Sequence, residues 1–234
     1  MLHFKFERAL FILKSYVGLY PKADSIIGFL AGFNPIKMGP MILILWGFWF
    51  QQDIETPSRR KAVIQACMGS LLAMIIARLI SLFAIFRLRP LQNPDVVLRL
   101  IEGINPADFN GWSSFPSDHA ALGFALATSI FFIHRKWGIL ALIHTAIIIC
   151  LPRMYLSLHY PTDIIAGALI GISITIVAMK TEFFNSLGSI ILRIEKTQIV
   201  FFYILFILFT SQMMQMFNDI RNLGSFLVKL FKII

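Results

Sequence analysis

The chain has 234 residues, of which 58% are hydrophobic and only 14% are charged. Because soluble domains are usually about 45–50% apolar and about 25% charged, this composition excludes an ordinary soluble domain and indicates a membrane protein. Lysine and arginine outnumber aspartate and glutamate, 21 against 12, for a formal net charge of +9. The basic residues are scattered at the ends of apolar runs, which favours anionic lipid headgroups or a phosphorylated substrate as partners over nucleic acid.

The N-terminal segment does not resemble a secretory signal, because it lacks an uninterrupted apolar core and a small-residue cleavage site. Phe6, Leu10, Leu13 and Val17 recur at helical spacing, and the nearby basic residues lie off that stripe. We therefore expect an N-terminal amphipathic helix that lies in the membrane interface. No Ser/Gly/Pro-rich linker, low-complexity tract or repeat divides the sequence, so residues 1–234 are expected to form a single domain.

Long apolar runs with charged ends follow this segment. A helix needs about 20 mainly apolar residues to cross a bilayer core of about 30 Å. Six stretches qualify when charged ends are allowed, namely 36–52, 62–86, 118–134, 137–156, 161–180 and 197–217. The runs are too long and too continuously apolar for membrane strands, which alternate apolar and polar residues. The sequence therefore predicts an all-α, polytopic membrane helix bundle with about six transmembrane helices.

The segments between these runs fall on two sides of the membrane. The linkers on one side carry basic residues, which are Arg59, Arg60, Lys61, Arg135, Lys136, Lys180, Arg193 and Lys196. The positive-inside rule makes this the cytoplasmic side. The long 87–117 loop and the short 153–160 break then face the outside, together with the polar motifs near them.

The break contains the sequence PRMYLSLHYPTD, between two runs that have no Asp, Glu, Lys or Arg. His159 and Asp163 are four residues apart, on one face of a helix that has Pro161 in its first turn. Asp163 is expected to accept the Nδ1 proton of His159, which fixes the tautomer and leaves Nε2 free to attack an electrophile. This pattern indicates a nucleophilic histidine.

Two arginines and a second histidine complete the expected site. Arg153 approaches from the end of the preceding span, and Arg89 in RLRP supplies a second guanidinium that matches phosphate oxygens in bidentate fashion. In FPSDH, Ser117 lies at the start of the third span, where the exposed N–H groups of a helix N-terminus can hold an anion. His119 is then expected to be the general acid that protonates the departing oxygen.

These motifs resemble those of the type 2 phosphatidic acid phosphatase superfamily, which comprises membrane lipid phosphatases and related haloperoxidases. The family signatures are Lys-x6-Arg-Pro, Pro-Ser-Gly-His and Ser-Arg-x5-His-x3-Asp. Residues 89–90 match the end of the first signature, and residues 116–119 match the second with Asp118 in place of glycine. Residues 153–163 match the third, with Pro152 where serine is usual. All three occur in order, and the predicted spans extend the resemblance over most of the chain.

The resemblance implies metal-independent hydrolysis of a phosphate ester in two steps, without a cofactor. His159 would attack phosphorus and form a phosphohistidine, with support from Asp163. His119 would protonate the leaving group and later help to activate water. The phosphoryl oxygens would be bound by Arg89, Arg153 and the Ser117 region.

The sequence departs from the family pattern at three positions, Leu82, Asp118 and Pro152. The family's lysine falls at Leu82, which cannot bind phosphate. Arg78, one helical turn earlier within an apolar span, or Arg87 is expected to take its place at the phosphate. The alternative is that Arg78 pairs with an acid such as Asp118, because an aspartate beside a phosphate needs an arginine to neutralise it.

Two other classes of function stay open. A metal-dependent membrane hydrolase would use His159 and Asp163 as ligands. A catalytically inactive lipid-binding scaffold or transporter of the same fold is suggested by the missing lysine. Among lipid substrates, undecaprenyl pyrophosphate, a phosphatidic acid, a phosphatidylglycerol phosphate and a lipid A phosphate all fit, and no residue selects one. The expected location is a bacterial inner membrane, with the active site facing the periplasm or exterior and with no obligate protein partner.

Overall fold

A computed structural model of the chain describes residues 16–94 and 105–218. Over these two ranges the regular structure is helical throughout, as the continuous apolar runs predict. The α-helices are α2 (Pro21–Gly32), α3 (Asn34–Phe50), α4 (Thr56–Phe83), α5 (Asp118–Ile133), α6 (Arg135–His144), α7 (Leu151–Tyr155), α8 (Pro161–Lys180), α9 (Glu182–Thr197) and α10 (Ile199–Met214). The short connecting elements are the 3-10 turns η1 (Pro90–Gln92) and η2 (Pro106–Phe109) and the π-helical segment η3 (Thr145–Cys150). Most of the expected N-terminal amphipathic helix lies outside the described residues.

All six predicted spans coincide with helices, but fewer are long enough to cross a membrane. Among the described residues, three helical segments meet that requirement, namely Thr56–Phe83, Arg135–Tyr155 and Pro161–Lys180. The α2–α3 pair, bent by 55°, adds a fourth if it is counted as one span. Helices α5 and α10 are apolar but only 16 residues long. The structure therefore supports a membrane bundle with three to four candidate spans, and the predicted number of six is not confirmed.

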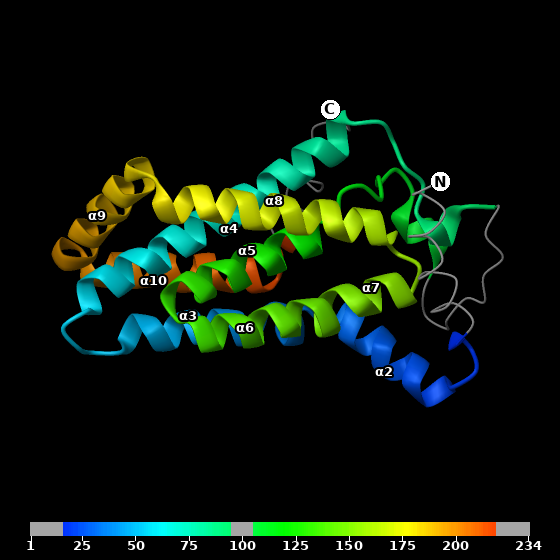
Figure 1. Cartoon of the computed structure of the whole chain (residues 1–234), viewed down its shortest axis with the longest axis horizontal. Helices are drawn as coiled ribbons and strands as arrows, with labels where there is room; N and C mark the ends of the chain where they lie inside the picture. Colours follow the sequence, from blue (N-terminus) through cyan, green and yellow to red (C-terminus); the bar gives the residue numbers. More distant parts are fainter. Residues whose placement is uncertain (1–15, 95–104, 219–234) are drawn as a thin grey trace, which may run out of the picture.

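Helices α4, α5 and α8 pack against one another at the centre of the bundle (Figure 1). Two glycines of α8 allow its backbone to approach α5 closely. A Cβ added at Gly167 would lie 2.3 Å from the carbonyl oxygen of Ser117, and one added at Gly171 would lie 2.3 Å from that of Ala121. Small residues permit this kind of close helix packing in membranes. The contact fixes the first turn of α5 against the first turn of α8, where the sequence motifs lie.

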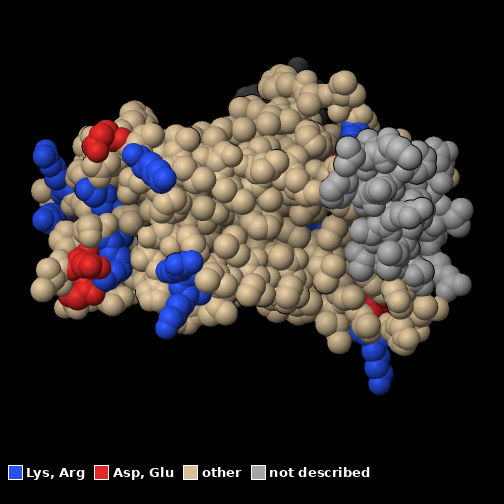
Figure 2. Space-filling view, in the orientation of Figure 1, with Lys and Arg blue, Asp and Glu red and all other residues tan. Residues whose placement is uncertain are grey.

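The two ends of the bundle differ in the residues that they carry (Figure 1). One end holds the α7–α8 break and the first turns of α5 and α8, so it brings the two histidine motifs together. The opposite end holds the α3–α4 turn, the α5–α6 turn and α9, and Figure 2 shows lysine and arginine side chains gathered over it. The basic linkers of the sequence therefore share one end of the molecule, away from the two histidine motifs.

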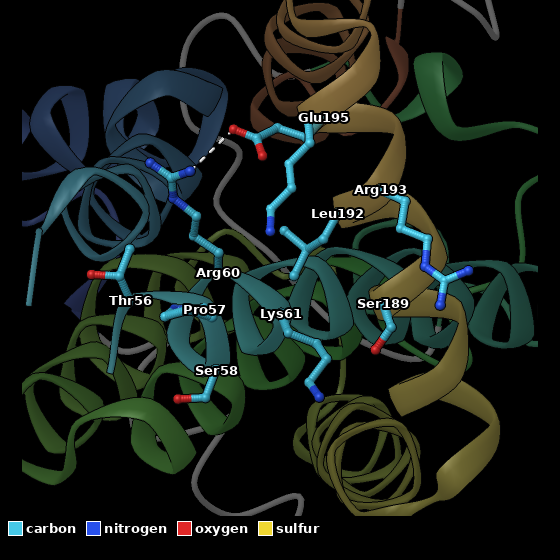
Figure 3. Close-up of a pocket in the computed structure, with 10 residues that line it drawn as sticks. Thr56, Pro57, Ser58, Arg60, Lys61, Ser189, Leu192, Arg193 and Glu195 are labelled. Carbon is cyan, nitrogen blue, oxygen red and sulfur yellow. Dashed lines mark hydrogen bonds and ion pairs between the residues drawn. The ribbon is translucent and has the colours of Figure 1, made fainter. Parts of the chain in front are cut away.

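A hollow of about 470 Å³ lies in this basic end, between the start of α4 and helix α9 (Figure 3). Arg60 and Lys61 of α4 and Arg193 and Lys196 of α9 line it. Glu195 pairs with Arg60 at 3.0 Å, so that one of these cations is neutralised within the hollow. The charge at this end is therefore predominantly basic.

Candidate active site

The α7–α8 break positions His159 through a tight turn of the backbone. Ser157 adopts a left-handed conformation with φ of 57°, and the N–H groups of Leu158 and His159 donate to the carbonyl oxygen of Arg153 at 3.0 and 3.3 Å. Helix α8 then begins at Pro161, whose missing N–H is not needed there. The turn encloses His159, which is 2% exposed.

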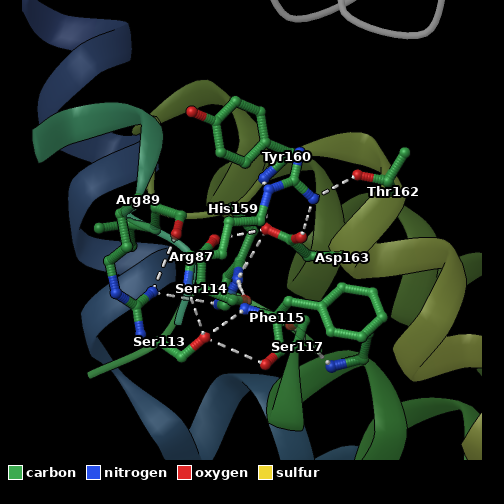
Figure 4. A network of polar contacts seen from close by, with 12 residues as sticks. Arg87, Arg89, Ser113, Ser114, Phe115, Ser117, His159, Tyr160, Thr162 and Asp163 are labelled. Carbon is green, nitrogen blue, oxygen red and sulfur yellow. Dashed lines mark hydrogen bonds and ion pairs between the residues drawn. The ribbon is translucent and has the colours of Figure 1, made fainter. Parts of the chain in front are cut away.

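Asp163 caps the start of α8, and this role decides where its carboxylate lies (Figure 4). Its Oδ2 accepts the N–H of Tyr160 at 2.8 Å and the hydroxyl of Ser114, and its Oδ1 accepts an N–H from Arg87 at 2.7 Å. The carboxylate is completely buried, and the Arg87 guanidinium also stacks 4.0 Å from the centre of the Tyr160 ring. Arg87 is therefore held by Asp163 instead of facing an open phosphate site.

The hydrogen bond of His159 differs from the one predicted. Nδ1 of His159 lies 2.8 Å from the carbonyl oxygen of Ser114, but 3.7 Å from Oδ2 of Asp163. Because Asp163 is drawn back to cap its own helix, the Ser114 carbonyl accepts the Nδ1 proton in its place. The tautomer expected from the sequence is thus obtained through a different partner. The residue type of Ser114 gives no sign of this role, since every residue has a backbone carbonyl.

Arg89 faces the other ring nitrogen of His159. Its Nη1 lies 3.3 Å from Nε2 of His159 and donates to the carbonyl oxygen of Leu158 at 2.9 Å. The side chain is 8% exposed, and its Nε has no hydrogen-bond partner among the described residues. A buried guanidinium with an unused donor next to Nε2 is well suited to bind an oxygen of a phosphoryl group.

Burial lowers the pKa of His159 below its ordinary value. The carboxylate of Asp163 acts in the opposite direction, and the Arg89 guanidinium lowers this pKa further. The imidazole is therefore neutral at neutral pH. Because Nδ1 holds its proton toward Ser114, the lone pair lies on Nε2, which is the atom that faces Arg89.

The second histidine is held by its neighbour in sequence. Oδ1 of Asp118 accepts both the backbone N–H and the Nδ1–H of His119, and each nitrogen lies 2.8 Å from it. Nε2 of His119 contacts the guanidinium of Arg153, and Arg153 also donates to the carbonyl oxygen of Ala31 at 3.2 Å. His119 and Arg153 thus lie together, as expected from the motifs, although they are separated by 34 positions in the chain.

Arg78 forms the pair with Asp118 that was the alternative to phosphate binding. Its Nη2 lies 2.6 Å from Oδ2 of Asp118, and its guanidinium lies 5.0 Å from the centre of the Trp112 ring. Leu82, at the position of the family's lysine, is 63% exposed. Both arginines that were candidates to replace the lysine are therefore engaged by aspartates, Arg78 by Asp118 and Arg87 by Asp163.

Ser117 lies in the contact between α5 and α8. It is completely buried, its N–H donates to the carbonyl oxygen of Asp163 at 3.1 Å, and its hydroxyl accepts the N–H of Ala120 at 3.4 Å. Its N–H, which was expected to bind an anion, is thus used to join the first turns of the two helices. In this arrangement Ser117 supports the site without facing it.

A cavity of about 330 Å³ adjoins His119 and Arg153. It is also lined by Lys37 of α3, which sequence analysis missed because Lys37 lies far from all three motifs in the chain. One signal was available, since a lysine inside a predicted span is costly and usually has a function. Within the described residues, no three His, Cys, Asp or Glu side chains are grouped as metal ligands.

Comparison with known proteins identifies the family. The model of the PAP2 superfamily matches residues 66–187, which is just over half of the chain and includes all three motifs. The bacitracin transport permease protein BcrC of Bacillus licheniformis is 30% identical over 76% of this chain and 82% of its own length. The chain therefore belongs to the PAP2 superfamily, and the resemblance seen in its motifs is confirmed.

Other relatives match shorter parts of their own sequences. The lipid A 4'-phosphatase of Bacteroides thetaiotaomicron is 38% identical over 36% of this chain and 38% of its own length. The undecaprenyl-diphosphatase of Sulfolobus acidocaldarius is 28% identical over 53% of this chain and 56% of its own length. No solved structure matches the chain.

Proposed function

We propose that this membrane protein is a metal-independent phosphatase of lipid phosphates or pyrophosphates that acts through a phosphohistidine. The observation that carries the proposal is the setting of His159. Its Nδ1 is bonded to the Ser114 carbonyl, its Nε2 lies beside the unused donor of Arg89, and burial keeps the ring neutral. A neutral imidazole with a directed lone pair next to a guanidinium is suited to attack a phosphoryl group.

The proposed reaction has two steps. In the first, Nε2 of His159 forms a bond to phosphorus, and the bond from phosphorus to the leaving oxygen breaks with its electron pair going to that oxygen. His119 donates a proton to the leaving oxygen, and its Nδ1–H is held by Asp118 during the transfer. In the second step, His119 takes a proton from water, whose oxygen attacks phosphorus and releases His159.

The arginines divide into two groups in this mechanism. Arg89 and Arg153 are the phosphate ligands, because each is buried and each has an Nε without a partner among the described residues. Arg87 and Arg78 do not bind the phosphate in this mechanism, and each instead pairs with an aspartate of the site. Arg87 neutralises the buried Asp163, and Arg78 neutralises the partly buried Asp118, so that two carboxylates are tolerated close to a phosphate site.

Family relatives support a lipid as substrate. Proteins named undecaprenyl-diphosphatase and lipid A 4'-phosphatase are among them, and both names refer to phosphates carried by membrane lipids. The apolar bundle is suited to lipid tails, and the site lies at one end, where a headgroup would lie. The basic residues at the opposite end favour that end as cytoplasmic. We propose that the site faces the periplasm or exterior of a bacterial inner membrane.

The test is phosphate release from purified protein with a panel of lipid phosphates and diphosphates, in excess chelator. Wild type is expected to release phosphate from at least one lipid, and His159→Ala is expected to release none. His134→Ala is the matched control, because His134 lies at the α5–α6 turn toward the opposite end of the bundle. Release that chelator abolishes would instead favour a metal-dependent hydrolase.

A transporter or lipid-binding scaffold is the second candidate. The observation in its favour is that the relative matching the largest part of the chain among those described above is named a transport permease. This candidate predicts that wild type releases no phosphate from any lipid of the panel. It also predicts that His159→Ala leaves lipid binding unchanged.

A further inference from the structure

Lys37 is a buried cation contributed by a helix that contains none of the family motifs. It lies in α3, just after the 55° bend between α2 and α3, and it is 1% exposed. Its Nζ donates to the carbonyl oxygen of Ala31 at 2.5 Å. The bend at Phe33 brings this carbonyl and Lys37 beside α7, which carries Arg153 (Figure 1).

Lys37 and Arg153 share one acceptor. Arg153 also donates to the carbonyl oxygen of Ala31, at 3.2 Å, so two buried cations converge on a single neutral oxygen. Within the part of the chain that the structure describes, neither forms a salt bridge with a carboxylate. Asp118 attracts both side chains, but it is already paired with Arg78 and His119. Two buried cations that share one such carboxylate are unfavourable unless an anion binds between or beside them.

The cavity beside these cations has room for such an anion. It measures about 330 Å³, and Lys37, His119 and Arg153 line it together with Asn34, Phe109 and Leu158. His159 is not among the lining residues, so the cavity lies on the side of the site that contains the general acid. In a displacement at phosphorus, the leaving group departs on the side opposite the nucleophile. The cavity is therefore where the leaving group of the proposed reaction would lie.

We infer that Lys37 binds an anionic leaving group, and that the site is built for lipid diphosphates in preference to lipid monophosphates. The inference rests on the proposed function. When Nε2 of His159 attacks the terminal phosphorus of a diphosphate, the bridging P–O bond breaks and its electron pair goes to the bridging oxygen. The lipid leaves as a phosphate monoester with increased negative charge, which the Lys37 ammonium stabilises.

Hydrolysis of a lipid monophosphate does not need the charge of Lys37 to stabilise its leaving group. Its leaving group is an alkoxide, and the proton of His119 neutralises it directly. A second cation on the leaving-group side then contributes little to the rate.

The test measures kcat/KM of wild type and of Lys37→Met on two substrates that differ by one phosphate, farnesyl diphosphate and farnesyl phosphate. The methionine keeps the length of the side chain and removes its charge. We expect kcat/KM to fall about 100-fold for the diphosphate, the size seen when one transition-state donor is removed, and less than about 3-fold for the monophosphate. Lys37→Arg should recover part of the loss, and the exposed Lys22→Met should leave both substrates unaffected.

The outcomes separate this inference from the proposed function. Retained activity of Lys37→Met on the monophosphate shows that the variant is folded. Equal losses on both substrates, or no loss on either, would overturn the role of Lys37 and leave the phosphatase proposal standing. Failure of wild type to release phosphate from either substrate would reject the proposed function, and the Lys37 inference with it.

Discussion

Residues 16–94 and 105–218 contain two histidine–aspartate pairs that are built in different ways. His159 and Asp163 are one helical turn apart, yet Nδ1 of His159 is 3.7 Å from the carboxylate and bonds to the Ser114 carbonyl. His119 and Asp118 are adjacent in sequence, and Nδ1 of His119 is 2.8 Å from Oδ1 of Asp118. The four-residue spacing therefore brings His159 near Asp163 without a direct hydrogen bond. The direct hydrogen bond forms between the adjacent residues His119 and Asp118.

The difference follows from the position of each carboxylate in its helix. Asp163 lies in the first turn of α8, where it accepts the N–H of Tyr160 and is held there. Asp118 is the first residue of α5 and turns toward the residue that follows it. The two histidines therefore have different kinds of hydrogen-bond acceptor. A neutral carbonyl orients the proposed nucleophile, and a full negative charge holds the group that transfers protons.

The largest expected effects are the losses of activity in His159→Ala and His119→Ala, which should depend differently on the leaving group of the substrate. His159→Ala should lower kcat by about 10⁵-fold or more for every substrate, because the nucleophile is lost. His119→Ala should lower kcat by about 10²–10⁴-fold for an alkyl phosphate. With an aryl phosphate, whose leaving group needs no proton, His119→Ala should recover most of the rate of the first step, measured as a burst of the aryl alcohol, whereas the attack of water stays slow. Recovery of His159→Ala by the same substrate would reverse the assignment.

Neutralising the two aspartates should give different results. Asp118→Asn should lower kcat by about 100-fold, because the amide does not hold the Nδ1 proton of His119 as the carboxylate does. Asp163→Asn should lower kcat by only about 10-fold, since the Ser114 carbonyl still orients His159. It should instead reduce the free energy of unfolding by about 2 kcal/mol, because Arg87 loses its buried partner. Equal losses of kcat would contradict the comparison.

The pH dependence should give the smallest effect. His159 attacks only when neutral, and burial lowers its pKa below the ordinary value of about 6.5. The acid limb of the activity profile, where the imidazole of His159 becomes protonated, should therefore lie below pH 6.5. Because Arg89 also lowers this pKa, Arg89→Gln should move the acid limb of its residual kcat/KM profile upward. A downward movement would contradict the contact of Arg89 with Nε2.

Much of the site could be predicted from the sequence, because the motifs lie next to helix ends whose positions are set by apolar runs. The three motifs predicted which residues meet, and the structure brings His159, Arg89, His119 and Arg153 to one end of the bundle. The pairing of Arg78 with Asp118 was foreseen as an alternative, since a buried carboxylate needs a cation.

The parts that sequence could not supply depend on tertiary contacts. A backbone carbonyl is present in every residue, so nothing in the sequence marked Ser114 as the acceptor for His159. The bend at Phe33 depends on packing between helices, and it is this bend that brings Lys37 to the cavity. The predicted number of six spans is not confirmed, because α5 and α10 are each only 16 residues long.

The most direct test of the account is to trap the intermediate. His119→Ala should slow the attack of water, so the phosphorylated enzyme should accumulate when it reacts with a good phosphoryl donor such as an aryl phosphate. After a rapid quench in base, mass spectrometry of peptides from the protein should find a base-stable, acid-labile phosphoryl group on His159. Phosphate release without any phosphorylated histidine, or with the phosphoryl group on another residue, would contradict the account.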